Sequence, residues 1–270
     1  MPYADLQGAR VAYKVDGSGP PLVLVHGTGG DAESNWAAFV EPLGREWTLI
    51  RPEYSGSGGT TDDGRPLTAA DLTRQVLAAA DAAGVQTFHL LGFSLGASLA
   101  AKIAGDQPER VRSLTLLAGF ASSKDPRQKL QFELWRDLIA TDRKAMARLI
   151  LLTGFSPDAV VALGTEGVKQ AMTGTLTGTD WNGMARQVEL DLSIDVTESI
   201  ASIVAPTLVI GCAHDQMVPS SHAKALAAAI PSARYAELPT GHLAPMEQPQ
   251  AFMNLIVPFL REQARAQEQR

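Results

Sequence analysis

The stretch 92–96 reads Gly-Phe-Ser-Leu-Gly, with Ser94 at its centre and a glycine two residues away on each side. An apolar run at 89–91 precedes it, and an alanine-rich run at 97–101 follows it. This spacing suits a sharp turn from a strand into a helix, because glycines let the two elements approach closely and the turn lifts the serine Oγ out of the sheet. A serine hydroxyl exposed at such a turn can attack a carbonyl carbon.

A serine hydroxyl is a poor nucleophile near neutral pH. It needs a base that accepts its proton and a carboxylate that orients the base. Asp215 follows an apolar run at 206–211, and the loops at the carboxyl edge of a parallel sheet form the crevice in which active sites lie. The chain order of serine, acid and histidine is that of the α/β-hydrolases. This sequence resembles that family at these points and over nearly its whole length outside a central insertion.

The resemblance to the α/β-hydrolases implies that Asp215 is the acid and His242 the base. The family carries Gly-His followed by Glu and Pro shortly before its terminal helix, and residues 239–249 contain that pattern around His242. The alternatives are a helix-capping aspartate and a histidine of a surface loop. A serine at position 94 also argues against the relatives that use an aspartate there, such as haloalkane dehalogenases and epoxide hydrolases.

An oxyanion hole requires backbone N–H groups that point to the developing negative charge. Leu95, the residue after the nucleophile, would supply one of them at the start of the predicted helix. The segment 26–30 reads His-Gly-Thr-Gly-Gly, and the resemblance implies that Thr28, which follows the His-Gly, supplies the other. A glycine-rich loop can also cradle phosphates, but no Lys-Ser or Lys-Thr follows, as a phosphate-binding P-loop would require.

The other titratable residues near these motifs receive structural interpretations. Asp191 and Asp195, the rival carboxylates from the middle of the chain, are expected to be solvated. We expect the histidine of segment 26–30 to brace its loop by hydrogen bonding and not to act as a second base. Apart from His242, the four histidines of the chain are assigned no catalytic role: His26, His89, His214 and His222.

The composition indicates one large α/β domain, or one domain with an insertion. The 270 residues are 45% hydrophobic and 19% charged, which provides enough apolar material for a sizeable core. The net charge of -6 gives no basic footprint for nucleic acid and no polybasic patch for a membrane surface. The single cysteine, Cys212, excludes an internal disulfide, and its apolar surroundings predict a buried side chain.

No segment predicts export or membrane insertion. Residues 1–6 lack the basic and apolar regions of a signal peptide, and no window holds the ~18 consecutive apolar residues of a membrane-spanning helix. We therefore expect a cytoplasmic protein without nucleic-acid or membrane partners. The sequence leaves its oligomeric state open.

Apolar runs alternate with helical patterns along both ends of the chain. Alternation at 3–6 and 9–15 predicts an initial hairpin. Strands are then predicted at 22–26, 47–52, 88–93, 113–118, 206–211 and 233–238, and helices at 36–46, 67–83, 95–107, 219–230 and 251–267. Such βα units indicate a mostly parallel, doubly wound sheet.

No clear run typical of a buried strand occurs between 122 and 200, where helices are predicted at 128–152 and 157–172. We expect this insertion, which follows the sixth predicted strand, to be a helical cap over the carboxyl edge of the sheet. The expected domains are a core of residues 1–121 and 201–270 and a cap of residues 122–200. The fold class is therefore expected to be an α/β-hydrolase fold with a cap.

The cap carries large apolar residues that could line a substrate pocket. The alternative for any one of them is contact between the cap and the core, because amphipathic helices usually bury their apolar stripe against the scaffold. The expected lining residues are Gly27 from the core and, from the cap, Phe132, Trp135, Phe155 and Trp181, with Leu138 and Met172 as further candidates. An apolar lining favours a small or medium hydrophobic acyl compound.

The expected reaction is acyl transfer to water, with a carboxylic ester as the first candidate substrate and with no cofactor or metal. Thioester, lactone and carbon–carbon bond hydrolysis remain open, because fold does not determine function. A lyase, perhydrolase, cofactor-free oxygenase or biosynthetic cyclase could use the same scaffold. So could a binding protein that retains the three side chains, or a purely structural module.

Overall fold

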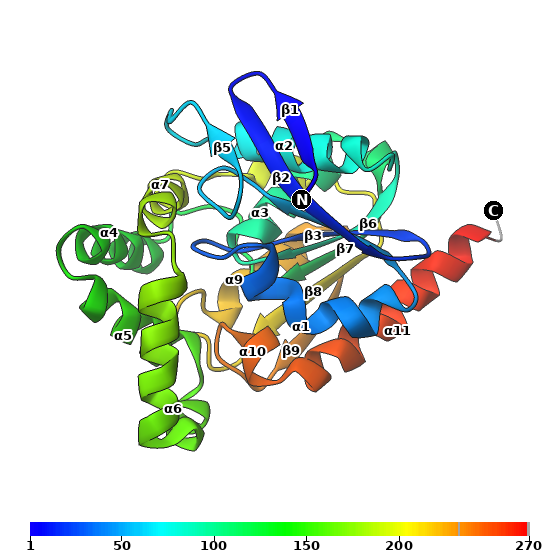
Figure 1. Ribbon diagram of the computed structural model, residues 1–270. Helices are drawn as coiled ribbons and strands as arrows, with labels where there is room; N and C mark the ends of the chain where they lie inside the picture. The colour runs from blue at the N-terminus through cyan, green and yellow to red at the C-terminus, as the bar shows by residue number, and fades with distance from the viewer. Residues whose placement is uncertain (232, 269–270) are drawn as a thin grey trace.

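The computed structural model describes residues 1–231 and 233–268, and its centre is a nine-stranded sheet (Figure 1). The strands are β1 (Tyr3–Leu6), β2 (Ala9–Gly17), β3 (Pro21–Val25), β4 (Thr48–Glu53), β5 (Thr61–Asp62), β6 (Phe88–Phe93), β7 (Val111–Leu117), β8 (Thr207–Cys212) and β9 (Arg234–Leu238). They lie in the order β1-β2-β4-β3-β6-β7-β8-β9, and β5 pairs with β2.

The strands from β4 to β9 in this order run parallel, and β1 and β2 form the expected antiparallel hairpin. Every residue of β6 and of β8 is buried. Central parallel strands are covered by helices on both faces, so they read as continuous apolar runs in the sequence. The predicted doubly wound α/β fold is confirmed.

Helices cover both faces of the sheet. On one face lie α1 (Ala32–Gly44) and α11 (Pro249–Glu268), which enclose a core that includes Trp36, Phe39 and Phe252. On the other face lie α2 (Ala69–Ala82), α3 (Leu95–Asp106) and α9 (Ser220–Ala229). A 3-10 turn η1 (Pro108–Arg110) and the short α10 (Ala244–Glu247) complete this part of the chain.

Five helices lie between β7 and β8 in the chain. The first four stand to one side of the sheet (Figure 1), and the fifth packs against α3. The five are α4 (Pro126–Thr141), α5 (Arg143–Gly154), α6 (Pro157–Gly178), α7 (Trp181–Asp191) and α8 (Thr197–Ile200). The insertion follows the sixth predicted strand, which is β7 here because no sequence pattern indicates the two-residue β5. A bridge between Ser122 and Asp195 joins the two ends of the insertion.

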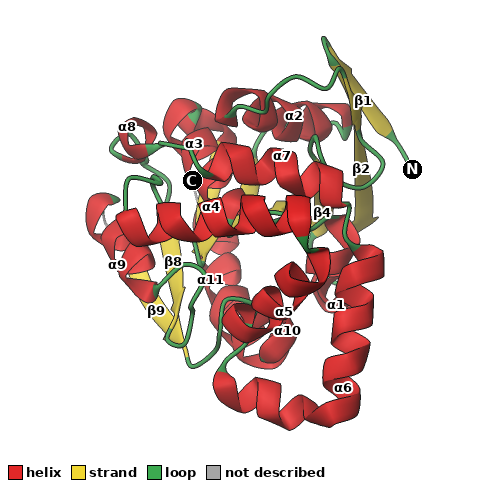
Figure 2. Ribbon diagram, turned by 90° about the vertical axis from the view of Figure 1, so that its left-hand side faces the viewer, coloured by secondary structure: helices red, strands yellow, loops and turns green. Residues whose placement is uncertain are grey.

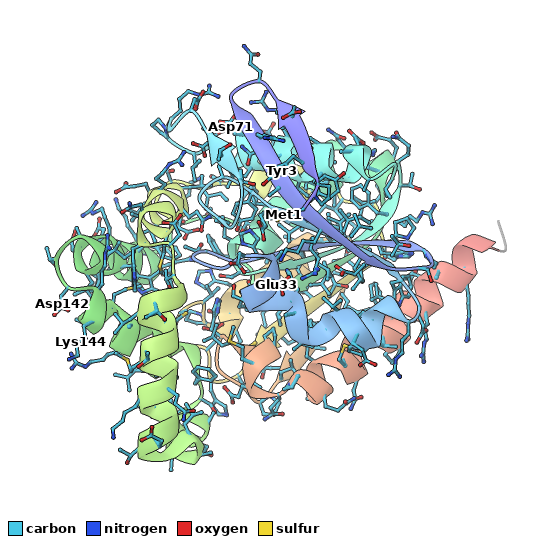
Figure 3. All side chains as sticks on the ribbon, viewed as in Figure 1. Met1, Tyr3, Glu33, Asp71, Asp142 and Lys144 are labelled. Carbon is cyan, nitrogen blue, oxygen red and sulfur yellow. The ribbon has the colours of Figure 1, made fainter. Side chains whose placement is uncertain are left out.

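One prediction for the insertion is wrong in detail, and one helix was missed. The single helix expected at 128–152 is two helices, because Asp142 leaves the helical conformation (φ -150°, ψ 82°) and its side chain caps α5 by accepting from the Ala145 N–H. Asp142 and its neighbour Lys144 lie on the outer edge of the insertion (Figure 3). The helix α7 was not predicted, and it contributes directly to the site described below.

The helix α6 projects from the rest of the insertion as a bent arm (Figure 2). It bends at Gly164, which has a positive φ of 61°, and it contains no fully buried residue. By contrast, α4 and α7 bury Trp135 and Met184 in the same apolar cluster as α2 and α3. The insertion is therefore anchored to the core through α4 and α7, and α6 is its least supported part.

Candidate active site

Four loops of the site leave the sheet at the same edge. Thr28 follows β3, Ser94 follows β6, Asp215 follows β8 and His242 follows β9. Because the carboxyl ends of parallel strands meet at one edge, residues far apart in the sequence are brought together there.

The turn at Ser94 has the sharp geometry that its glycines predicted. Ser94 adopts φ 56° and ψ -122°, a conformation that is uncommon for a residue with a side chain. A Cβ on Gly92 would lie 2.2 Å from the Gly96 carbonyl oxygen, and one on Gly96 would lie 2.3 Å from the His26 carbonyl oxygen. Both positions therefore require glycine, and the Ser94 N–H is held by the Leu117 carbonyl at 2.9 Å.

A continuous hydrogen-bond chain joins Ser94, His242 and Asp215. The Ser94 Oγ lies 2.9 Å from His242 Nε2, and His242 Nδ1 lies 2.7 Å from Asp215 Oδ2. The other carboxylate oxygen of Asp215 accepts the N–H groups of Met217 and Val218 at 2.8 and 2.7 Å. All three side chains of the chain are buried. The carboxylate is thus fixed by backbone donors, and it orients the imidazole toward the serine.

The glycine-rich loop after β3 leaves one backbone donor free. The N–H groups of Gly27, Gly29 and Gly30 bond to Asn35 Oδ1, Gln187 Oε1 and the Gly27 carbonyl oxygen. For the Thr28 N–H, the described part of the chain provides no such acceptor. Leu95 is the first residue of α3, where N–H groups have no partner within the helix. The N–H groups of Thr28 and Leu95 are the two donors that the sequence predicted for the oxyanion hole.

His26 has a structural environment, as expected. Its ring stacks on Tyr54 with centroids 3.9 Å apart, and the Tyr54 hydroxyl donates to the His26 carbonyl oxygen at 2.8 Å. Its Nδ1 lies 2.9 Å from the Gly27 carbonyl oxygen. Complete burial lowers the pKa of His26 to about 4, so the ring is uncharged near neutral pH.

The expectation that Asp191 is solvated is wrong. Asp191 ends α7 and is 1% exposed, and its Oδ2 accepts the Thr28 hydroxyl at 2.7 Å. Burial raises the pKa of Asp191 to about 8, because a charged carboxylate loses its hydration there. Asp191 follows Gln187 and Met184 at helical spacing, so the periodicity of α7 could have revealed its buried face.

Asp195 is exposed, as expected. It accepts the Thr197 N–H and hydroxyl and pairs with Lys124 at 2.6 Å. These hydrogen bonds lower the pKa of Asp195 to about 2.

A cavity of about 360 Å³ opens above Ser94 and His242. Of the expected lining residues, Gly27, Trp135 and Phe155 border it. Phe132 and Trp181 lie outside its wall: Phe132 packs against Phe120 and Trp135, and the Trp181 indole donates to the Leu176 carbonyl. Further apolar lining comes from Ile150, Leu151, Met184, Met217 and Leu243. The cavity wall is therefore mainly apolar, and Ser94 and His242 supply polar groups at its base.

The remaining candidates lie apart from this chemistry. His89 is buried in the sheet beside the Ser113 hydroxyl, and burial raises the pKa of Cys212 to about 12, which leaves an unreactive thiol. In residues 1–231 and 233–268, no group of three His, Cys, Asp or Glu side chains is arranged to hold a metal ion. The described helices include none with the length and apolar character to cross a membrane.

Glu247 ties the His242 loop to the insertion. Its carboxylate accepts the Ser156 N–H at 2.9 Å, the Ser156 hydroxyl at 2.6 Å and the Gly241 N–H at 3.0 Å. We expect Glu247→Gln to lower the free energy of unfolding by about 1–3 kcal/mol, because a neutral amide oxygen replaces the carboxylate oxygen that accepts two backbone N–H groups. Urea denaturation measures this change. Ser156→Ala removes one of these three bonds together with the N-cap of α6, in which the Ser156 hydroxyl accepts the Ala159 N–H, and it should also lower the stability. Equal stability of all three proteins would contradict the account.

Comparison with known proteins gives a consistent group of relatives. The model of the alpha/beta hydrolase fold family matches residues 20–249. The pyrrolizixenacetamide deacetylase of Xenorhabdus hominickii is 55% identical over 252 residues, which cover 93% of this chain and 95% of that protein. A hydrolase from Pseudomonas aeruginosa PA01 shares 30% identity at a TM-score of 0.84, covering 96% of this chain and 97% of that one. The enol-lactonase from Burkholderia xenovorans LB400 shares 26% identity at a TM-score of 0.85, covering 96% and 100%.

Proposed function

Because this chain belongs to the α/β-hydrolase family and is a hydrolase, we propose that Ser94 is its nucleophile, His242 its general base and Asp215 the carboxylate that orients the base. The observation that carries this proposal is the hydrogen-bond chain of 2.9 and 2.7 Å from the serine through the imidazole to the carboxylate. Each member lies within four residues of the carboxyl end of a strand, so the sheet positions all three side chains.

The proposed reaction proceeds in two acyl transfers. His242 Nε2 takes the proton of Ser94 while Oγ attacks the carbonyl carbon, and the protonated imidazole then gives this proton to the leaving group. Asp215 stabilises the imidazolium without taking the proton itself. Water activated by His242 subsequently attacks the acyl-enzyme and restores the serine.

The oxyanion hole in this proposal consists of the Thr28 and Leu95 N–H groups. The free Thr28 donor and the position of Leu95 at the start of α3 support it. Such donors act most strongly where water is excluded, and they need no rearrangement when the charge develops.

We propose that residues 122–200 act as a lid on a core of residues 1–121 and 201–270, and that the substrate is a small or medium hydrophobic acyl compound. The apolar wall contributed by Trp135, Phe155 and Leu243 supports this size and polarity. The deacetylase name of the relative at 55% identity favours an acetylated amine as substrate. The enol-lactonase favours an ester as the second candidate, at lower similarity.

Paired substrate series test both of these candidates. We expect hydrolysis of aryl acetamides and aryl acetates, with rates falling as the acyl chain lengthens, because the cavity volume of about 360 Å³ must hold both halves of the substrate. The measurement is kcat/KM across matched amides and esters, together with mass spectrometry of an acid-quenched reaction. An acyl group on the peptide containing Ser94 is the expected result. Turnover without such a group under slow deacylation would contradict the covalent mechanism.

A further inference from the structure

One face of the cap helix α7 makes polar contacts with the loops that line the site. Gln187 and Asp191 are four residues apart, so their side chains share this face. Gln187 is buried: its Oε1 accepts the Gly29 N–H at 2.8 Å, and its Nε2 donates to the Ser57 hydroxyl at 2.8 Å. One turn later, Asp191 Oδ2 accepts the Thr28 hydroxyl at 2.7 Å. Two consecutive residues of the glycine-rich loop are thus bonded to one helix of the cap.

We propose that Asp191 is a positioning residue, which holds Thr28 through its side-chain hydroxyl so that the Thr28 N–H points to the oxyanion. The inference rests on the proposed function, and it assigns to the cap a part in the oxyanion hole in addition to covering the substrate. Asp191 itself does not contact the reacting atoms, because its carboxyl is buried behind Thr28.

Asp191 adds a side-chain contact to a loop whose own backbone is permissive. Thr28 stands between Gly27 and Gly29, and Gly29 has a positive φ of 69°. Glycines allow many backbone conformations, so the peptide groups of this loop keep their orientation only through hydrogen bonds. The Gly27–Thr28 peptide is held at its carbonyl oxygen by the Gly30 N–H, and the next peptide is held by the bond from the Gly29 N–H to Gln187. The Thr28 hydroxyl is the side-chain group through which this stretch can be held, and it donates a hydrogen bond to Asp191.

The surroundings of Asp191 favour an uncharged carboxyl. Its Oδ1 is buried and finds no hydrogen-bond partner among the described residues, and burial raises the pKa of the group to about 8. Tyr54 is the titratable neighbour from the core, and burial keeps its pKa well above 10, so it is also uncharged. His26, stacked on Tyr54, is neutral because burial lowers its pKa to about 4.

The cap contributes no buried charge to this region. The helix α4, which packs on α7, turns Gln128, Phe132 and Trp135 inward. Its charged side chains are half-buried or exposed: Arg127, Lys129, Glu133, Arg136 and Asp137. On α7 itself, Arg186 pairs with Asp62 and Glu189 is exposed. Ionisation of Asp191 would therefore place an uncompensated negative charge behind Thr28, where the reaction also develops negative charge.

Two substitutions at Asp191 separate the hydrogen bond from the charge. Asp191→Asn keeps the shape and the hydrogen bond to Thr28 but has no charge at any pH. Asp191→Leu keeps a similar volume and removes the hydrogen bond. Thr28→Val removes the same bond from the other side, and Asp195→Asn is the matched control at an exposed carboxylate of the cap.

The experiment measures kcat and KM for an aryl acetate at pH values from about 6 to about 10, which bracket the expected ionisation. We expect Asp191→Leu and Thr28→Val each to lower kcat by about 10- to 100-fold with little change in KM, since misplacing an oxyanion donor affects the transition state. The double variant should lose no more than either single one. Asp191→Asn should retain most of kcat near neutral pH and lose the decline above about pH 8 that the parent and Asp195→Asn share.

Hydrogen exchange of the peptide containing residues 26–30 tests the positioning independently of turnover. We expect faster exchange in Asp191→Leu and parent-like exchange in Asp191→Asn, because only the leucine removes the hydrogen bond to the Thr28 hydroxyl. Unchanged exchange and kcat in Asp191→Leu would overturn the inference, as would an alkaline decline that survives in Asp191→Asn. If Ser94→Ala retains turnover, the proposed function fails instead, and the exchange result still decides whether Asp191 positions the loop.

Discussion

Replacing Ser94 with alanine is expected to lower kcat by about 10⁴-fold or more while leaving the fold intact. The Ser94 hydroxyl is the group that is hydrogen-bonded to His242 Nε2, so the substitution removes the proposed nucleophile. Single deletions within such a set of residues remove most of the catalysis that the set provides. The fold should survive, because the hydrogen bond of the Ser94 side chain goes to His242 and alanine can follow the same backbone path. Turnover of an aryl acetate and circular dichroism of both proteins measure the two halves of this expectation.

Ser98→Ala is the matched control. Ser98 lies one turn later on α3, is also buried, and donates its hydroxyl to the Phe120 carbonyl at 2.6 Å. Its loss should reduce stability by about 1 kcal/mol, the usual value of one buried hydrogen bond, without a comparable loss of kcat. Parent-like turnover by Ser94→Ala would refute the assignment of the nucleophile.

The free energy of unfolding is expected to fall by ~1.4 kcal/mol per pH unit between pH about 4 and about 8, relative to Asp191→Asn. Asp191 ionises near its ordinary pKa of 3.8 in the unfolded chain, whereas burial raises its pKa to about 8 in the folded protein. The folded state therefore holds one more proton in this window. Stability from the neutral carboxyl is fully present below pH about 4 and is lost as the pH rises through the folded pKa.

Urea denaturation at several pH values measures this dependence for the parent and for Asp191→Asn. Subtracting the free energies of unfolding of the two proteins at each pH removes the contributions of the other titrating groups, which are common to both. Asp195→Asn provides a control of opposite sign, because the pKa of Asp195 is lowered to about 2 and its contribution is lost only as the pH falls toward that value. Identical slopes for the parent and Asp191→Asn between pH about 4 and about 8 would mean that Asp191 is hydrated.

Local patterns predicted most of the scaffold. The apolar runs of β3, β6 and β8 and the glycine spacing around Ser94 act within a single strand or turn, so they can be read without knowledge of distant residues. The placement of Asp215 and His242 after separate strands could also be anticipated, because parallel strands end at one edge. The structure brings these side chains within hydrogen-bond distance, and their catalytic roles remain predictions for the experiments above.

Helix packing decided what local patterns could not. Phe132, Trp135 and Trp181 are all large and apolar in the sequence, but only Trp135 borders the cavity, because the docking of α4 and α7 determines which side of each helix meets the core. The break at Asp142 depends on one capping side chain within an otherwise helical pattern.

The sequence by itself determined the sheet, the sharp turn at Ser94 and the edge at which the candidate residues gather. Only the tertiary structure decided the protonation state of Asp191, whose hydrogen-bond partner Thr28 lies 163 residues away in the chain. The physical reason is that burial belongs to the assembled molecule. The same carboxyl is hydrated and acidic in an isolated helix, but it holds its proton once the cap and core together exclude water from it.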